Sequence, residues 1–169
     1  MRPTLSALDP TVPSTSARLY AVLYRSVAAP DLRDDDLSGI LRASMQHNAR
    51  ERITGLLLYS GAAAPATPAR LFVQWLEGPR EAVRRVYDRI CRDHRHVDCE
   101  VLAEGWSADL LGQDARLFPY WSMSFDAPGA LPTTPGGMQA YARTHTGAYG
   151  AAHPLRAQTL GAPQLAEAG

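Results

Sequence analysis

The stretch Leu71-Phe72-Val73-Gln74-Trp75-Leu76-Glu77-Gly78 is an apolar run with one amide at its centre. Its pattern predicts a buried strand that ends at Glu-Gly-Pro, and the proline suits the first turn of a helix that follows directly. Burying a side-chain amide without partners costs about 1–3 kcal/mol. Gln74 therefore either lies on an edge strand and faces solvent, or it meets a polar ligand inside the fold.

The apolar patterns on both sides of this stretch predict the other elements. Helices are expected over 34–48 and 79–93, and strands over 19–26, 53–59, 71–76, 97–103 and 117–125. The strands 53–59 and 71–76 are expected to pair antiparallel, and Pro119 indicates an edge position or a bulge. The order β-α-β-β-α-β-β predicts an α+β, ferredoxin-like sheet with two helices packed on one face.

The less regular segments set the expected domain limits. Residues 1–16 are interpreted as a flexible N-terminal arm, 17–126 as one domain, and 127–169 as a partly ordered extension with a weak helical piece near 138–143. Within the domain, 61–69 and the polar stretch 104–114 are expected to be irregular.

Composition excludes several classes of function. The 169 residues carry 17 basic and 17 acidic side chains, which cancel, so no strong field favours nucleic acid or an anionic membrane. All basic residues are arginine, which excludes a Schiff-base lysine. Cys91 and Cys99 lack a metal-ligand spacing, and no metal site is expected. Without an apolar span or a secretion signal, a cytoplasmic location is expected.

Several polar residues are expected to converge in this topology. The strands that contain Tyr24 and Gln74 belong at the middle of the sheet, on the face covered by the helices. Asn48 would look onto this region from the first helix, and a charged group would lie at the far end of the second helix: Arg89, Asp93, Arg95 and His96. Taken singly, these residues also fit a core aromatic, a helix terminus or surface ion pairs. Together they suit a planar heterocycle with carbonyls, ring nitrogens and a phosphate tail.

Over about residues 19–126 the chain resembles the BLUF domain family, the blue-light sensors that bind flavin adenine dinucleotide (FAD). Five blocks in the same order carry the resemblance: Leu-Tyr-Arg-Ser at 23–26; His47-Asn48-Ala49-Arg50 with Ile53-Thr54-Gly55-Leu56-Leu57; Phe72-Val73-Gln74-Trp75-Leu76-Glu77-Gly78; Arg92-Asp93-His94-Arg95-His96; and Phe118-Pro119-Tyr120-Trp121-Ser122-Met123.

The resemblance implies a role for each matching residue. Tyr24 would be the electron and proton donor to the excited flavin, Gln74 would bridge the phenol and the flavin N5/O4 edge, and Asn48 would hold the O4/N3 edge. The cofactor-binding set would also include His47, Arg89, Asp93, Arg95 and His96. The signal would leave the pocket through Ser26, Trp121 and Met123.

The function implied is an FAD-binding blue-light photoreceptor that is not itself an enzyme. Its loops at 60–70 and 104–117 are longer than is usual in the family, and the 43 residues after Asp126 carry no enzymatic effector domain. They would resemble the short BLUF proteins, which act by association with themselves and with a downstream protein partner. The alternatives are a flavin-dependent redox enzyme on the same scaffold and a ferredoxin-like interaction or nucleic-acid module, which the neutral charge disfavours.

Overall fold

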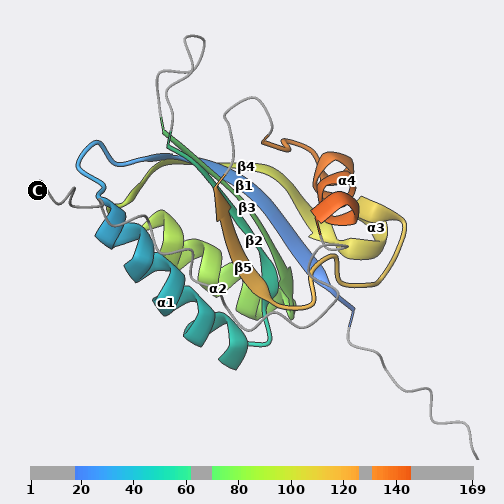
Figure 1. Ribbon diagram of the computed structural model, residues 1–169. Coiled ribbons are helices and arrows are strands. Elements are labelled where there is room, and N and C mark those ends of the chain that lie inside the picture. Colours follow the sequence, from blue (N-terminus) through green and yellow to red (C-terminus); the bar gives the residue numbers. More distant parts are fainter. Residues whose placement is uncertain (1–17, 62–69, 126–130, 146–169) are drawn as a thin grey trace, which may run out of the picture.

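The computed structural model describes residues 18–61, 70–125 and 131–145 of the chain. These residues form one five-stranded sheet with helices on both faces (Figure 1). The predicted arm at 1–16, nearly all of the loop at 61–69 and much of the extension at 127–169 lie outside the described residues. No helix in the described ranges is both long and apolar enough to cross a membrane.

The sheet has the strand order β4-β1-β3-β2-β5. Its strands are β1 (Tyr20–Ala28), β2 (Thr54–Ser60), β3 (Leu71–Gly78), β4 (His96–Trp106) and β5 (Trp121–Phe125). The pairs β1–β3, β1–β4 and β2–β3 are antiparallel, whereas β5 adds to β2 in parallel. The predicted ferredoxin-like arrangement is confirmed, with the strands of Tyr24 and Gln74 side by side at the centre.

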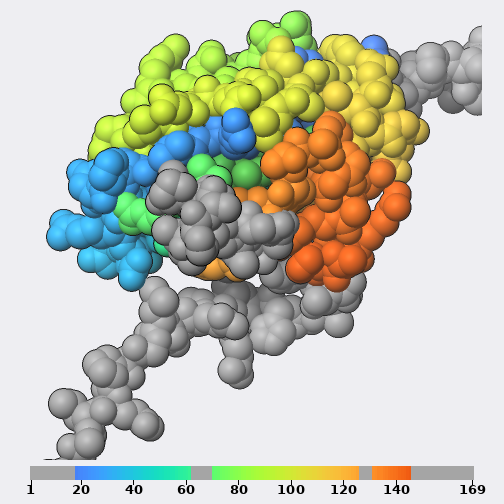
Figure 2. All heavy atoms as spheres, turned by 90° about the horizontal axis from the view of Figure 1, so that it is seen from above, coloured from blue at the N-terminus to red at the C-terminus, as the bar shows by residue number. Residues whose placement is uncertain are grey.

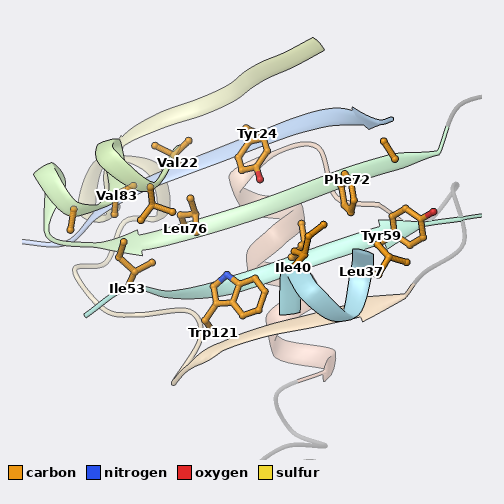
Figure 3. Packing of buried hydrophobic residues seen from close by; sticks show 14 of the residues in the cluster. Val22, Tyr24, Leu37, Ile40, Ile53, Tyr59, Phe72, Leu76, Val83 and Trp121 are labelled. Atoms are coloured by element: carbon orange, nitrogen blue, oxygen red, sulfur yellow. The ribbon is translucent and has the colours of Figure 1, made fainter. Parts of the chain in front are cut away.

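Helices α1 (Asp34–Arg50) and α2 (Arg80–Cys91) cover one face of the sheet, as predicted. A buried apolar cluster fills the space between them and the strands, and Figure 3 shows Val22 and Tyr24 of β1, Ile40 of α1 and Trp121 of β5 within it. At the start of α1 the Asp36 carboxylate accepts a hydrogen bond from the backbone N–H of Arg33 (2.9 Å). The acidic first turn therefore satisfies a donor that the helix leaves free.

A second apolar cluster lies on the opposite face. It contains Trp75 from β3, Phe118 from the segment before β5, and Met138 and Ala142 from α4 (Pro135–His145). In Figure 2 the orange atoms of α4 lie against the yellow atoms that include α3 (Ser107–Leu111), and these two helices are in contact. Both faces of the sheet are therefore covered. The weak helical piece expected near 138–143 is confirmed as α4, but the pattern did not predict that it packs on the sheet.

The sequence prediction was wrong in two places. The stretch 104–114 is not irregular throughout, because β4 continues to Trp106 and α3 follows at once. The last strand begins at Trp121 rather than near 117, which places Pro119 before the strand. A proline has no N–H to give to a ladder, and β5 is an edge strand, in agreement with the position that Pro119 indicated.

Candidate functional site

The hydroxyl of Tyr24 donates a hydrogen bond of 2.5 Å to Oε1 of Gln74. The two residues face each other across the antiparallel β1–β3 pair, and they are 0% and 2% exposed. Burial, together with the nearby thiols of Cys99 and Cys91, raises the pKa of the Tyr24 phenol well above its usual value of 10. The site therefore holds a neutral phenol bonded to an amide, and Gln74 is not an edge residue.

The register extends this pair into a row that crosses four strands. Gln74 also stands opposite Leu57 of β2, and Leu57 stands opposite Met123 of β5. Trp121 lies two residues before Met123 and so shares its face of the sheet. Trp121 is buried at 5% exposure, whereas Met123 is half-buried against the same cluster. Trp121 and Met123, two of the three predicted signal residues, thus lie on the face of Tyr24 and Gln74.

A cleft of about 220 Å³ opens between α1 and α2 on this face. Six of the predicted cofactor-binding residues line it: His47, Asn48, Arg89, Asp93, Arg95 and His96. Tyr24 and Gln74 do not line the cleft. They lie within the sheet, and the Tyr24 ring is 6.5 Å from the His96 ring at the cleft wall.

Asn48 carries a buried polar atom without a hydrogen-bond partner among the described residues, at the wall of the cleft. Its side chain is 2% exposed, and Oδ1 has no hydrogen-bond partner among the described residues. An unpaired buried acceptor is costly, and it is a common sign of a missing partner. A ring N–H such as N3–H of a flavin would satisfy this oxygen. This buried acceptor therefore fits the ring N–H of a flavin.

The other side of the cleft is electropositive. The guanidinium of Arg95 donates hydrogen bonds to the Asp93 carboxylate, from Nε at 2.9 and 3.1 Å and from Nη2 at 2.5 Å. This bond from Arg95 lowers the pKa of Asp93 to about 2. Arg89 adds a second guanidinium to the lining, so two cations outnumber one carboxylate there. Such a set suits a phosphate group.

His96 joins the cleft to the strand that carries Tyr24. Its Nδ1 lies 2.9 Å from Oγ of Ser26, and its ring packs on Phe72 with the ring centres 4.5 Å apart. Burial is the main cause that lowers the pKa of His96 to about 4. A neutral imidazole at neutral pH therefore links Ser26, one of the predicted signal residues, to the cleft.

Sequence reasoning missed part of the site. The cleft is also lined by five residues of the two predicted helices that were not singled out as site residues: Ile40, Ala43, Ser44, Val86 and Ile90. Helical spacing groups residues on a face but does not separate a core from an apolar cleft. Glu77 was also missed as a buried group: it is 0% exposed, and the rule that singled out Gln74 applies to it equally.

The chain resembles known proteins in its family pattern, its sequence and its structure. A family model described as "Sensors of blue-light using FAD" (BLUF) matches residues 19–124. Among sequences, the beta subunit of the photoactivated adenylate cyclase of Euglena gracilis is 41% identical over 90 residues, which cover 51% of this chain and 10% of that protein.

Two further proteins extend the comparison. The blue light- and temperature-regulated antirepressor BluF of Escherichia coli (strain K12) is 33% identical over 84 residues, 47% of this chain and 18% of its own length. The dark-state structure of BlrB, a BLUF protein, is 30% identical with a TM-score of 0.54, covering 74% of this chain and 84% of BlrB. This chain therefore spans a small part of those two sequence relatives but most of BlrB.

Proposed function

Because the chain belongs to the BLUF family, the sensors of blue light that use FAD, we propose that Tyr24 and Gln74 carry its response to light. One observation supports this assignment above all others. The two side chains form a buried hydrogen bond at the centre of the sheet, on the face where the cleft of Asn48 and the two arginines opens.

The cleft offers groups for both the ring system and the phosphates of FAD. The free Oδ1 of Asn48 would accept a hydrogen bond from the ring system, and Arg89 and Arg95 would bind the phosphates. Asp93 would hold the Arg95 guanidinium in place through their three side-chain hydrogen bonds, and His47 and His96 would complete the wall.

When bound, FAD absorbs blue light and accepts an electron in its excited state. Tyr24 would be the donor, and its phenol is neutral because burial raises its pKa. Loss of an electron makes a phenol strongly acidic, so its proton would leave along the existing bond to Oε1 of Gln74. The Gln74 amide carries both a donor and an acceptor, so rotation or tautomerisation would change which of its atoms faces the flavin.

We propose that the output is a change in protein–protein contacts, and that the chain has no enzymatic activity of its own. Its sequence relatives include a photoactivated cyclase and a light-regulated antirepressor, so sensors of this family serve different outputs. A change that crosses from Gln74 through Leu57 would reach the edge strand β5 at Met123. An edge strand is accessible to another copy of the chain or to a downstream protein, and we place this activity in the cytoplasm.

Absorption spectroscopy before and after blue light tests the proposal. Protein purified under dim light and reconstituted with FAD should show a flavin band that shifts to the red and returns in darkness. The variant Gln74→Asn, whose side chain is one methylene shorter and would not bridge Tyr24 and the flavin, should bind FAD without the shift. A yellow wild-type protein that ignores blue light would contradict the proposal, and oxidation of NADPH by the holoprotein would favour a redox enzyme instead.

A further inference from the structure

Glu77 is a carboxylate buried at 0% exposure on β3, three residues after Gln74. Side chains alternate along a strand, so Glu77 points to the face opposite Gln74, where it lies with Trp75. Both carboxylate oxygens are used as acceptors. They receive four hydrogen bonds, from Thr54 Oγ1 (3.0 Å), Trp75 Nε1 (3.0 Å), and the backbone N–H groups of Leu117 (3.0 Å) and Phe118 (2.9 Å).

Arg116 makes a second set of hydrogen bonds next to the Glu77 carboxylate. Its guanidinium donates to Oγ1 of Thr54 (2.7 Å), to the backbone carbonyl of Glu77 (3.0 Å) and to that of Arg52 (2.8 Å). The segment 116–118 is thus bonded to the start of β2 and the end of β3. We call Glu77, Thr54 and Arg116 together the carboxylate anchor.

The anchor lies between the photochemical residues and the edge of the sheet. Trp75 follows Gln74 directly, is 0% exposed, and donates its indole N–H to Glu77. Phe118, whose backbone N–H is bound by Glu77, packs with Trp75 and with Met138 of α4 in the second apolar cluster. Three residues after Phe118 the chain enters β5 at Trp121.

We propose that Glu77 is a positioning residue that couples β3 to the segment 116–121, so that β5 and α4 follow β3 when the hydrogen bonds of Gln74 rearrange. The inference rests on the proposed light response and adds a route for it on the face away from the cleft. A shift of β3 passes to Leu117 and Phe118 because a carboxylate that accepts four bonds from three segments cannot move without them.

Glu77→Gln is a near-isosteric test. Each carboxylate oxygen accepts two donors, so an amide NH₂ in either orientation would face two N–H or O–H donors and lose those bonds. The hydrogen bond of Tyr24 to Gln74 lies on the other face and should be kept. Glu81→Gln is the matched control, because the Glu81 side chain is 76% exposed on α2.

The experiment records absorption and hydrogen exchange by mass spectrometry on the same FAD-loaded samples, in darkness and under blue light. In the wild type and in Glu81→Gln, light should shift the flavin band and change exchange in 116–125 and 131–145. In Glu77→Gln the flavin band should still shift, while the light-dependent change in exchange should fall below about half of the wild-type value.

Arg116→Met keeps the test usable if Glu77→Gln does not fold, since Arg116 lies at the surface. This variant removes the hydrogen bonds of Arg116 to Thr54, Glu77 and Arg52. It should also reduce the light-dependent change in hydrogen exchange, while the flavin band still shifts. The inference is overturned if both variants show the same spectral shift and the same light-dependent change in hydrogen exchange as the wild type. It is also overturned if light does not change hydrogen exchange in residues 116–125 of the wild type. A wild type without a spectral shift refutes the proposed function itself, and the inference falls with it.

Discussion

Tyr24 and Gln74 are paired through both backbone and side chain. The register of β1 and β3 places their backbones opposite each other, and a hydrogen bond of 2.5 Å joins their side chains. A buried phenol and a buried amide satisfy each other in this arrangement. The bond is also the only contact among the described hydrogen bonds through which the Tyr24 hydroxyl can release a proton. In the proposed light response, stability and photochemistry therefore depend on the same pair of atoms.

Tyr24→Phe should bind FAD and show no spectral shift under blue light, because it lacks both the oxidisable phenol and the proton. It should also lose about 1–3 kcal/mol of unfolding free energy, since Oε1 of Gln74 loses its donor. Absorption spectra before and after illumination and urea unfolding measure the two effects. Tyr87→Phe is the control, because its ring packs on Tyr24 at 5.2 Å without a bond to Gln74. A shift that persists in Tyr24→Phe would contradict the assignment.

Asn48→Ala should have opposite effects on stability and on FAD affinity. The FAD-free protein should gain about 1 kcal/mol, because an unpaired buried oxygen is removed and alanine is the better helix former. The dissociation constant of FAD should rise about tenfold, the value of one hydrogen bond of roughly 1.4 kcal/mol. Thermal unfolding and quenching of flavin fluorescence measure these quantities.

Gln46→Ala provides the control for that variant. Gln46 is exposed on the same helix, so the change alters helix propensity without touching the cleft. If Asn48→Ala destabilised the FAD-free protein, or bound FAD as tightly as Gln46→Ala does, then Oδ1 of Asn48 would not be the atom that awaits the flavin.

The sequence predicted the middle of the fold better than its edges. Strand order and the placement of Tyr24, Gln74 and Asn48 follow from apolar periodicity, because a central strand must bury both faces and a polar residue there needs a partner. The topology predicted that Asn48 and the charged group of the second helix face one region, and the family resemblance added His47 and the expected cofactor roles. The structure brings these six residues together around one cleft.

The rest depends on contacts between segments that lie far apart in the chain. The extension of β4 to Trp106 is set by pairing with Tyr20, Ala21 and Val22 of β1, not by local propensity. The late start of β5 reflects the bonds that hold Leu117 and Phe118 to Glu77, 40 and 41 residues earlier. No periodicity within a short window reports such a partner.

The stability of the FAD-free protein should fall as the pH falls from about 6.5 to 4. Burial is the main cause that lowers the pKa of folded His96 from 6.5 to about 4. The charge of Arg95 lowers this pKa further, whereas the charge of Asp93 raises it. In that window the unfolded chain binds the proton and the folded chain does not, so unfolding is favoured by up to about 3 kcal/mol. Asp93, whose pKa is lowered to about 2, adds its own loss only below about pH 4.

Urea unfolding of the FAD-free protein at several pH values between 4 and 7 measures this slope. His96→Gln should flatten it, because the titrating group is gone. His94→Gln should leave it unchanged, since the His94 side chain is 86% exposed. Equal slopes for wild type and His96→Gln would show that another group causes the loss.

Gly55 is the position where an added methyl group should disturb the sheet most. Its φ of +151° is one that other residues rarely adopt, and a Cβ there would lie 2.0 Å from the backbone oxygen of Trp75. Gly55 also pairs with Trp121 and donates its N–H to the Tyr120 carbonyl (3.3 Å). Gly55→Ala should therefore cost about 3 kcal/mol or more, because β2 must move away from β3 or from β5.

Gly112→Ala separates backbone strain from this clash. Gly112 has φ +70° but its added Cβ meets nothing within 4 Å, so only the strain of about 1–2 kcal/mol is expected. Urea unfolding of both variants with FAD bound gives the comparison. If Gly55→Ala were no less stable than Gly112→Ala, the close approach of β2 to β3 would not be needed. Because Leu57 stands between Gln74 and Met123, a shifted β2 should also weaken the light-dependent change at β5.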